Sequence, residues 1–224
     1  MKQLKLSDRL STATHYVRDG AIVADIGTDH AYIPIFLTLE GRVKHAIASD
    51  INEGPILRAR ENILEYGLEG KITTRISNGL NGIEQYEPTD ILICGMGGEL
   101  IADIIDACEY VKKSNIRLIL QPMTSIYELR SYLKNGFLTI DENIVYEDGK
   151  FYQIICVEYD GITRSYSDAE LELGSMNIKK REPVFLENLK FLIEKKRKIM
   201  QGIKKGGGNT EKIEKNIKEL EMLL

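Results

Sequence analysis

The chain has 224 residues, of which 43% are hydrophobic and 29% are charged. This length allows one ordinary domain with a smaller appendage, and the apolar content excludes intrinsic disorder. No run approaches the roughly 18 apolar residues of a membrane span, and residues 1–9 lack the apolar core of a signal peptide. The three widely spaced cysteines, Cys94, Cys108 and Cys156, are predicted to be reduced core thiols, so the sequence indicates a cytoplasmic protein.

The charge is unevenly distributed along the chain. The formal net charge of −4 by itself suggests no nucleic-acid partner. Residues 179–205, however, carry ten basic side chains and three glutamates, so this stretch is +7 and the remainder is −11. Such asymmetry is typical of a polyanion-binding arm on an acidic body, and it also fits a solvated helix face.

The first 160 residues alternate short β-branched runs with helical patterns. Continuous apolar strands that alternate with helices predict an α/β fold with a doubly wound parallel sheet covered on both faces. The last two strands, joined by a glycine turn at 147–150, add an antiparallel hairpin. In chain order we expect a helix that begins at Ser7 and ends near Gly20, a strand at 21–26, a helix at 32–39, a strand at 45–50, a helix capped by Asn52 and closed at Gly67, strands at 72–76 and 90–94, a helix at 100–108, a strand at 116–120, a helix at 125–134, and the hairpin strands 137–146 and 151–159.

The C-terminal part has a different pattern. Apolar residues recur at helical spacing from Phe185 to Ile203, and again from Ile213 to Leu224 after a glycine-rich break at 205–210. Two striped helices around a turn predict a C-terminal helical hairpin that is coiled-coil-like, with Thr210 as the cap of its second helix. The predicted domains are therefore 1–163 and 164–224. The hairpin pairs with itself, with the first domain or with another copy, so the choice between monomer and homodimer stays open.

The first strand ends in an acidic residue, Asp25, two positions before Gly27. In S-adenosylmethionine sites such an acid lies near the cofactor's ammonium group, and the glycine lets backbone approach the ligand. A dinucleotide site would need G-x-G-x-x-G, and here Asp29 would repel a pyrophosphate. Asp25, Gly27 and Thr28 are therefore predicted to bind S-adenosylmethionine, with a simple tight turn as the alternative.

Polar or glycine-rich segments follow three other predicted strands. A carboxylate at the end of the second strand can accept both ribose hydroxyls, and ligands of open α/β sheets bind at the carboxyl ends of the strands. The pair Asn78-Gly79 beside an aliphatic residue suits an adenine ring, and the run 94–98 is predicted to form an open backbone floor. The predicted cofactor-binding residues in these segments are Asp50, Ile51, Asn78, Gly79, Leu80, Gly95 and Met96.

Three blocks of the sequence resemble a known family. The stretches 25–34, 95–98 and 120–122 are similar to those of the bacterial tRNA adenine-N1 methyltransferases that act at position 22, and the resemblance covers the whole chain. It implies a class I methyltransferase domain with a Rossmann-like sheet and a coiled-coil-like arm. It also implies methyl transfer from S-adenosylmethionine to the N1 atom of an adenine in tRNA, with Asp25, Gly27, Asp50, Asn78 and Gly95 lining the cofactor.

Methylation at adenine N1 needs alignment of the methyl donor with N1 and does not need a general base, because N1 carries its own lone pair. Asp29 and His30, beside the cofactor turn, are the catalytic candidates for orienting the base or taking up a proton, and Gln121 is the candidate reader of the base edge. His30 can equally pack against the cofactor, and Tyr32 is expected in the helix core rather than stacked on a flipped base. A metal site made by Asp25, Asp29 and His30 is rejected, because the cofactor explains these residues better.

Position 22 lies inside the folded tRNA core, so the base has to be extruded to reach the methyl group. The basic arm would then hold the tRNA through its phosphates. The predicted RNA-binding residues are Lys195, Lys196, Arg197, Lys198, Lys204 and Lys205. Besides a methyltransferase of another RNA, two other classes remain open: a small-molecule or protein methyltransferase whose arm only dimerises, and a non-catalytic RNA-binding module with a degenerate cofactor pocket.

Overall fold

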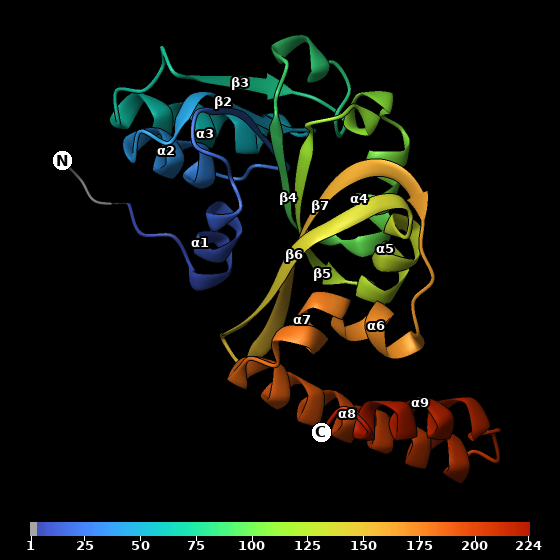
Figure 1. The fold of residues 1–224 in the computed structure, drawn as a ribbon. Coiled ribbons are helices and arrows are strands. Elements are labelled where there is room, and N and C mark those ends of the chain that lie inside the picture. Colours follow the sequence, from blue (N-terminus) through green and yellow to red (C-terminus); the bar gives the residue numbers. More distant parts are fainter. Residues whose placement is uncertain (1–3) are drawn as a thin grey trace. The chain divides into compact units, whose positions relative to one another are not determined.

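The structure is a computed structural model that describes residues 4–224. The chain divides into two compact units, the first ending at Arg164 and the second spanning Ser165–Leu224 (Figure 1). This division lies one residue from the expected boundary between 163 and 164, and Met1–Gln3 of the expected first domain lie outside the described residues. Within residues 4–224, no helix has the length and apolar character needed to cross a membrane.

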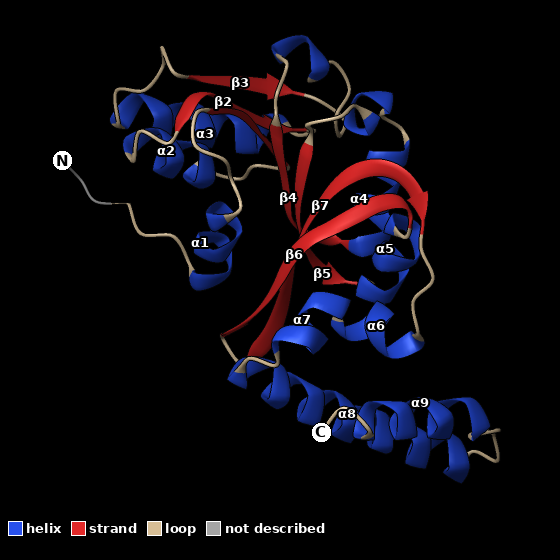
Figure 2. Ribbon diagram, viewed as in Figure 1, coloured by secondary structure: helices blue, strands red, loops and turns tan. Residues whose placement is uncertain are grey.

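The first unit is built on a seven-stranded sheet in the order β3-β2-β1-β4-β5-β7-β6 (Figure 2). The strands from β3 to β5 are parallel, and β7 runs antiparallel to both β5 and β6. The predicted parallel sheet with a terminal hairpin is therefore confirmed. The strands are β1 (Ala21–Ile26), β2 (Val43–Asp50), β3 (Ile72–Ile76), β4 (Asp90–Gly97), β5 (Arg117–Thr124), β6 (Asn135–Glu147) and β7 (Lys150–Thr163).

Helices cover both faces of this sheet, as its apolar strands require. On one face Ile101 and Leu129, from α4 and α5, pack on Ile91 and Leu118. On the other face α1 and α2 pack on the central strands, and α2 and α3 pack on Ala46 and its neighbours. The helices of this unit are α1 (Asp8–His15), α2 (Tyr32–Leu39), α3 (Glu53–Glu65), α4 (Gly98–Asp106), α5 (Ile126–Leu133) and the short 3-10 helices η1 (Glu84–Tyr86) and η2 (Glu109–Lys112).

The sheet order places a switch point at the centre of the first unit. The chain leaves β1 toward β2 and β3 and then returns to β4 on the other side of β1. Ligands of open α/β sheets bind at the carboxyl ends of the strands beside such a reversal. A ligand-binding site is therefore expected at the carboxyl ends of β1, β2, β3 and β4 and in the segments that follow them.

The second unit consists of four consecutive helices: α6 (Asp168–Leu173), α7 (Ser175–Lys180), α8 (Pro183–Lys205) and α9 (Glu211–Glu221). The predicted hairpin corresponds to α8 and α9, whose buried residues include Phe185, Leu189 and Ile193 on α8 and Ile217 on α9. The stripe ends earlier than expected on α8, because Ile199 is 47% exposed. The short helices α6 and α7 were not predicted.

The three predicted N-cap residues have the right positions, but their predicted capping hydrogen bonds are wrong. Ser7, Asn52 and Thr210 stand at N-cap positions, but none of their side chains accepts a capping hydrogen bond. Before α3, the Asp50 carboxylate accepts the Asn52 N–H instead, at 2.7 Å. Before α9, Asn209 Oδ1 accepts the Glu211 N–H at 2.8 Å.

The cysteines are free thiols, as predicted, and all three belong to or pack against the core clusters. Cys156 is buried, whereas Cys94 and Cys108 are half-buried. Cys108 faces a groove that is described below.

Candidate active site

The turn after β1 is held by backbone hydrogen bonds to the neighbouring strand. The N–H groups of Gly27 and Thr28 both donate to the Ser49 carbonyl at 2.8 Å, and Thr28 Oγ1 accepts the Ala31 N–H at 3.1 Å. Gly27 has φ +77°, and a Cβ there would lie 2.1 Å from Met96 Cε. The left-handed conformation therefore favours glycine at this position, and the Met96 side chain lies directly against it.

Asp25 is a buried carboxylate at the end of β1, with an exposed fraction of 6%. Burial raises the pKa of Asp25 to about 6 from its usual 3.8; a hydrogen bond from Thr28 opposes this shift, and the Asp50 charge adds to it. Among residues 4–224, no cationic side chain forms an ion pair with Asp25. A buried carboxylate of this kind is suited to a cationic group supplied by a ligand.

The predicted ribose and adenine residues follow the two neighbouring strands. Asp50 ends β2 and uses Oδ1 for the Asn52 N–H, and Ile51 beside it is 57% exposed. After β3, Asn78 is exposed and Leu80 is buried. Ser77 Oγ donates a hydrogen bond of 2.6 Å to the Asn81 carbonyl, and this bond fixes the loop that carries Asn78 to Leu80.

The glycines at the carboxyl end of β4 and the start of α4 do not form the uniformly open floor that was expected. Gly95 is exposed, has φ +82°, and a Cβ there would meet no atom within 4 Å. Gly97 still belongs to β4, and Gly98 begins α4 in a closely packed position where a Cβ would lie 2.2 Å from the Ser125 carbonyl oxygen. Only the Gly95 end of this segment is open to a ligand.

Asp29 and His30 belong to a polar cluster at the start of α2. His30 Nε2 lies 3.2 Å from Asp29 Oδ2, and Arg58 Nη2 lies 2.5 Å from Asp29 Oδ1. Asn62 Nδ2 donates to the His30 carbonyl at 3.0 Å. Tyr32 is 42% exposed, so its expected place in the helix core is wrong; its ring stacks on His30 with the centroids 5.0 Å apart.

Gln121 does not present the hydrogen-bonding edge that was expected. Its side chain is fully buried, its Oε1 accepts from Arg9 Nη1 at 2.6 Å, and its Nε2 donates to the Pro122 carbonyl at 3.0 Å. Both ends of the amide are therefore used inside the protein, which argues against base reading by Gln121. Arg9, which also donates its backbone N–H to Glu147 at 2.9 Å, was missed because one arginine in an amphipathic helix carries no sequence signal.

The basic residues predicted to bind RNA lie on α8, where they fall into two groups. Lys195, Lys198, Lys204 and Lys205 are exposed. Lys196 Nζ lies 2.6 Å from Glu172 on α6, and Arg197 pairs with Glu194 at 2.5 Å and with Glu221 of α9 at 2.7 Å. The charges of Lys196 and Arg197 are thus used to join the helices of the second unit. Among residues 4–224, no group of three or more His, Cys, Asp or Glu side chains is arranged to hold a metal ion.

The arrangement defines the class of protein. A buried acid, a glycine turn, a second acid and an open glycine lie at the carboxyl ends of adjacent strands in a sheet of methyltransferase order. Residues 6–155 match the family described as a methyltransferase domain. The first unit is therefore a methyltransferase domain with a Rossmann-like fold.

Comparison with known proteins identifies the family within this class. The chain is 37% identical to the tRNA (adenine(22)-N(1))-methyltransferase of Bacillus subtilis, over 98% of this chain and 94% of the relative. A putative tRNA (m1A22) methyltransferase from Streptococcus pneumoniae, solved with S-adenosyl-L-methionine, has a TM-score of 0.87 at 34% identity, covering 98% of this chain and 100% of that one. A Mycoplasma capricolum structure with S-adenosyl-homocysteine has a TM-score of 0.81 at 29% identity, covering 97% and 96% of the two chains.

The chain belongs to the tRNA (adenine(22)-N1)-methyltransferase family. The expectation drawn from the three sequence blocks is confirmed at the level of the family.

The burial of Asp25 leads to a prediction about stability. Because the pKa of Asp25 in the folded chain is about 6 rather than 3.8, the fold holds this proton more tightly than the unfolded chain does. Ionisation of Asp25 therefore destabilises the ligand-free fold as the pH rises through this range. We expect Asp25→Asn to raise the free energy of unfolding by up to about 3 kcal/mol above about pH 7, and to change it little below about pH 4.

Urea unfolding of both proteins at a series of pH values measures this difference. An Asp25→Asn variant that is less stable than the wild type above neutral pH would contradict the destabilising effect of the Asp25 charge.

Proposed function

We propose that this protein transfers the methyl group of S-adenosylmethionine to the N1 atom of adenine 22 in tRNA, and that it acts in the cytoplasm. The single observation that carries the proposal is the buried Asp25 carboxylate, which has no cation partner among residues 4–224 and lies beside the Gly27 turn. The amino-acid part of S-adenosylmethionine has the ammonium group that such a carboxylate requires. Membership of the family supports the same substrate and target atom.

The residues at the strand ends fit the parts of this cofactor in spatial order. Asp25, Gly27 and Thr28 would hold the amino-acid part, with Gly95 and Met96 across the turn on β4. Asp50 retains one carboxylate oxygen beyond its bond to the Asn52 N–H, and this oxygen can accept from ribose hydroxyls. The adenine would then lie against Ile51 and the segment Asn78, Gly79 and Leu80.

When bound, S-adenosylmethionine supplies a methyl group on a positively charged sulfur. The acceptor N1 has a lone pair, so the task of the protein is to align the base and exclude water. The stacked rings of His30 and Tyr32 form an exposed aromatic surface on which an extruded adenine can stack. Asp29 Oδ2 lies 3.2 Å from His30 Nε2 while Asp29 Oδ1 pairs with Arg58, so Asp29 would orient the His30 ring.

The exposed lysines of α8 support tRNA as the substrate. Lys195, Lys198, Lys204 and Lys205 are free to contact phosphates, whereas Lys196 and Arg197 hold the second unit together. We propose that the four exposed lysines bind the tRNA backbone and that the two paired residues contribute by positioning them.

Methyl transfer is tested directly with purified protein, methyl-labelled S-adenosylmethionine and a tRNA transcript. We expect 1-methyladenosine in nucleoside mass spectrometry from a transcript with adenine at position 22, and none from the matched transcript with guanine there. Equal labelling of the two transcripts would contradict the target position. Absence of a labelled nucleoside from any RNA would contradict RNA methylation and favour one of the other two classes.

Asp50 provides a test of the cofactor site. Asp50→Ala removes the acceptor for the ribose hydroxyls, and we expect calorimetry to show S-adenosylhomocysteine binding weakened by about tenfold or more. The matched control is Asp148→Ala, at the β6–β7 turn, which is expected to bind as the wild type does. An Asp50→Ala affinity equal to that of the control would refute the ribose role.

Two substitutions of His30 separate the role of its ring in packing from the role of its nitrogen atoms in the reaction. His30→Phe keeps a ring on Tyr32 but cannot contact Asp29, so it should bind S-adenosylhomocysteine normally and lower kcat by about tenfold or more if the nitrogen atoms act in the reaction. His30→Ala, which removes the ring as well, should also raise KM for tRNA. Wild-type kcat in His30→Phe would assign His30 a packing role only.

The role of α8 can be tested by reversing three exposed charges. Lys195→Glu, Lys198→Glu and Lys205→Glu together should weaken tRNA binding and reduce the slope of log Kd against log salt by about 2 to 3, because each phosphate contact releases counterions. Fluorescence anisotropy at several salt concentrations measures both quantities.

The control for this experiment has the same net charge. Lys44→Glu, Lys71→Glu and Lys150→Glu reverse three exposed charges in the first unit instead. If the two triple variants lose the same slope, the effect comes from net charge and α8 is a solvated face.

A further inference from the structure

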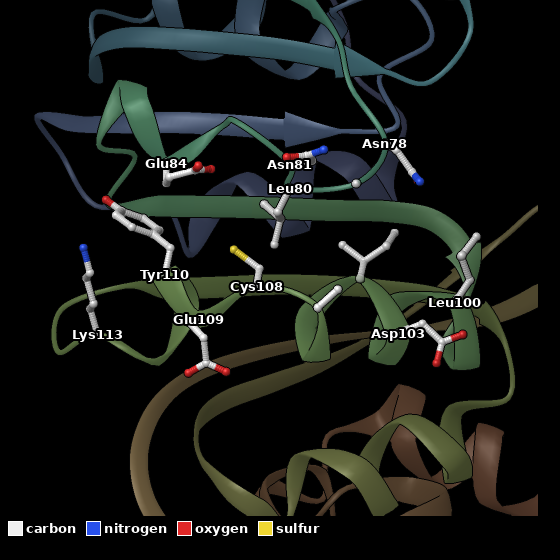
Figure 3. A pocket seen from close by; sticks show the side chains of 13 residues that line it. Asn78, Leu80, Asn81, Glu84, Leu100, Asp103, Cys108, Glu109, Tyr110 and Lys113 are labelled. Atoms are coloured by element: carbon white, nitrogen blue, oxygen red, sulfur yellow. The ribbon is translucent and has the colours of Figure 1, made fainter.

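A groove of about 780 Å³ lies in the first unit, between the loop after β3 and the segment formed by α4 and η2 (Figure 3). Asn78 and Leu100 lie at one end of the labelled residues, and Tyr110 and Lys113 lie at the other. The first end contains Asn78, Gly79 and Leu80, the residues assigned above to the adenine. The groove is therefore continuous with the adenine end of the proposed cofactor site.

The floor of the groove is apolar. Leu80 is 4% exposed, and Ile104, Ala107 and Cys108 line the same cavity. Gly79, with φ +58°, brings its backbone close to Ile104, since a Cβ at Gly79 would lie 3.2 Å from that side chain. The floor is thus shaped by a glycine that turns the loop toward α4, and it suits an apolar group.

The rim and the far end determine what the groove excludes. Glu84, Asp103 and Glu109 line the cavity and would repel an anionic group. At the far end Tyr110 donates its hydroxyl to the Pro88 carbonyl at 3.0 Å, and Lys113 Nζ lies 4.6 Å from the centre of the Tyr110 ring. This aromatic ring, held by its hydroxyl and covered by the Lys113 ammonium, lines the far end of the groove.

We propose that this groove accepts an apolar group carried on the exocyclic N6 atom of the adenine, so that the site binds adenosyl compounds enlarged at N6. The inference rests on the proposed function, because the proposed position of S-adenosylmethionine sets the orientation of its adenine relative to the groove. With the amino-acid part at Asp25 and the ribose at Asp50, the adenine points toward Asn78. An asparagine amide pairs with the amino edge of adenine, so N6 faces the mouth of the groove.

Calorimetry with S-adenosylhomocysteine and its N6-benzyl derivative tests the proposal. We expect the wild type to bind the two compounds with affinities within about tenfold of each other, because the benzyl group enters an existing apolar cavity. Ala107→Trp adds a large side chain at an exposed position that lines the groove. It should weaken binding of the N6-benzyl compound by about tenfold or more and leave S-adenosylhomocysteine within about twofold.

The matched control is Asp106→Trp, which adds the same side chain at the neighbouring exposed position outside the groove lining. It should bind both compounds as the wild type does. The proposal is overturned if the wild type binds S-adenosylhomocysteine but rejects the N6-benzyl compound by more than about tenfold, or if Ala107→Trp and Asp106→Trp behave alike. Failure of S-adenosylhomocysteine itself to bind would instead overturn the proposed function.

Discussion

The proposed site depends on the burial of the Asp25 carboxylate without a cationic partner, which lowers the stability of the ligand-free fold. A lone ionised carboxylate is unfavourable in a buried position, and the raised pKa of Asp25 expresses this. The turn beside Asp25 is held by the hydrogen bonds that the Gly27 and Thr28 N–H groups donate to the Ser49 carbonyl. The ligand-free chain therefore holds an unfavourable charge that the ammonium group of the proposed cofactor would neutralise.

The order of the sheet follows from sequence patterns that are strong in this chain. Continuous apolar strands such as Ala21–Ile26 require cover on both faces, and a parallel sheet follows from the helices between them. The acids Asp25 and Asp50 could be proposed as site residues because each lies at the carboxyl end of such a strand. Local side-chain bonds were harder to predict, since Asp50 and Asn209 each accept a backbone N–H next to an expected cap residue that makes no capping bond.

The errors at the site arise from contacts between residues far apart in the chain. Gln121 has the chemistry to read a base, but Arg9, which is 112 positions away, occupies it. Tyr32 looked like core because its neighbours are apolar, yet its ring stacks on His30 at the surface. Lys196 and Arg197 belong to a run of four cations, and only the positions of Glu172 and Glu221 distinguish them from their neighbours. No sequence pattern in a single chain records such pairings.

The place of β7 in the sheet has a consequence for synthesis of the protein. β7 lies between β5 and β6 although it is made after both, so the edge of β5 has no partner until residues 150–163 have emerged. An uncovered edge strand of apolar residues is an aggregation hazard, and here it persists from the synthesis of β5 at residues 117–124 until β7 has been made. Arg9 likewise acquires its partner Glu147 only after β6 has been made, so this contact of α1 also forms late.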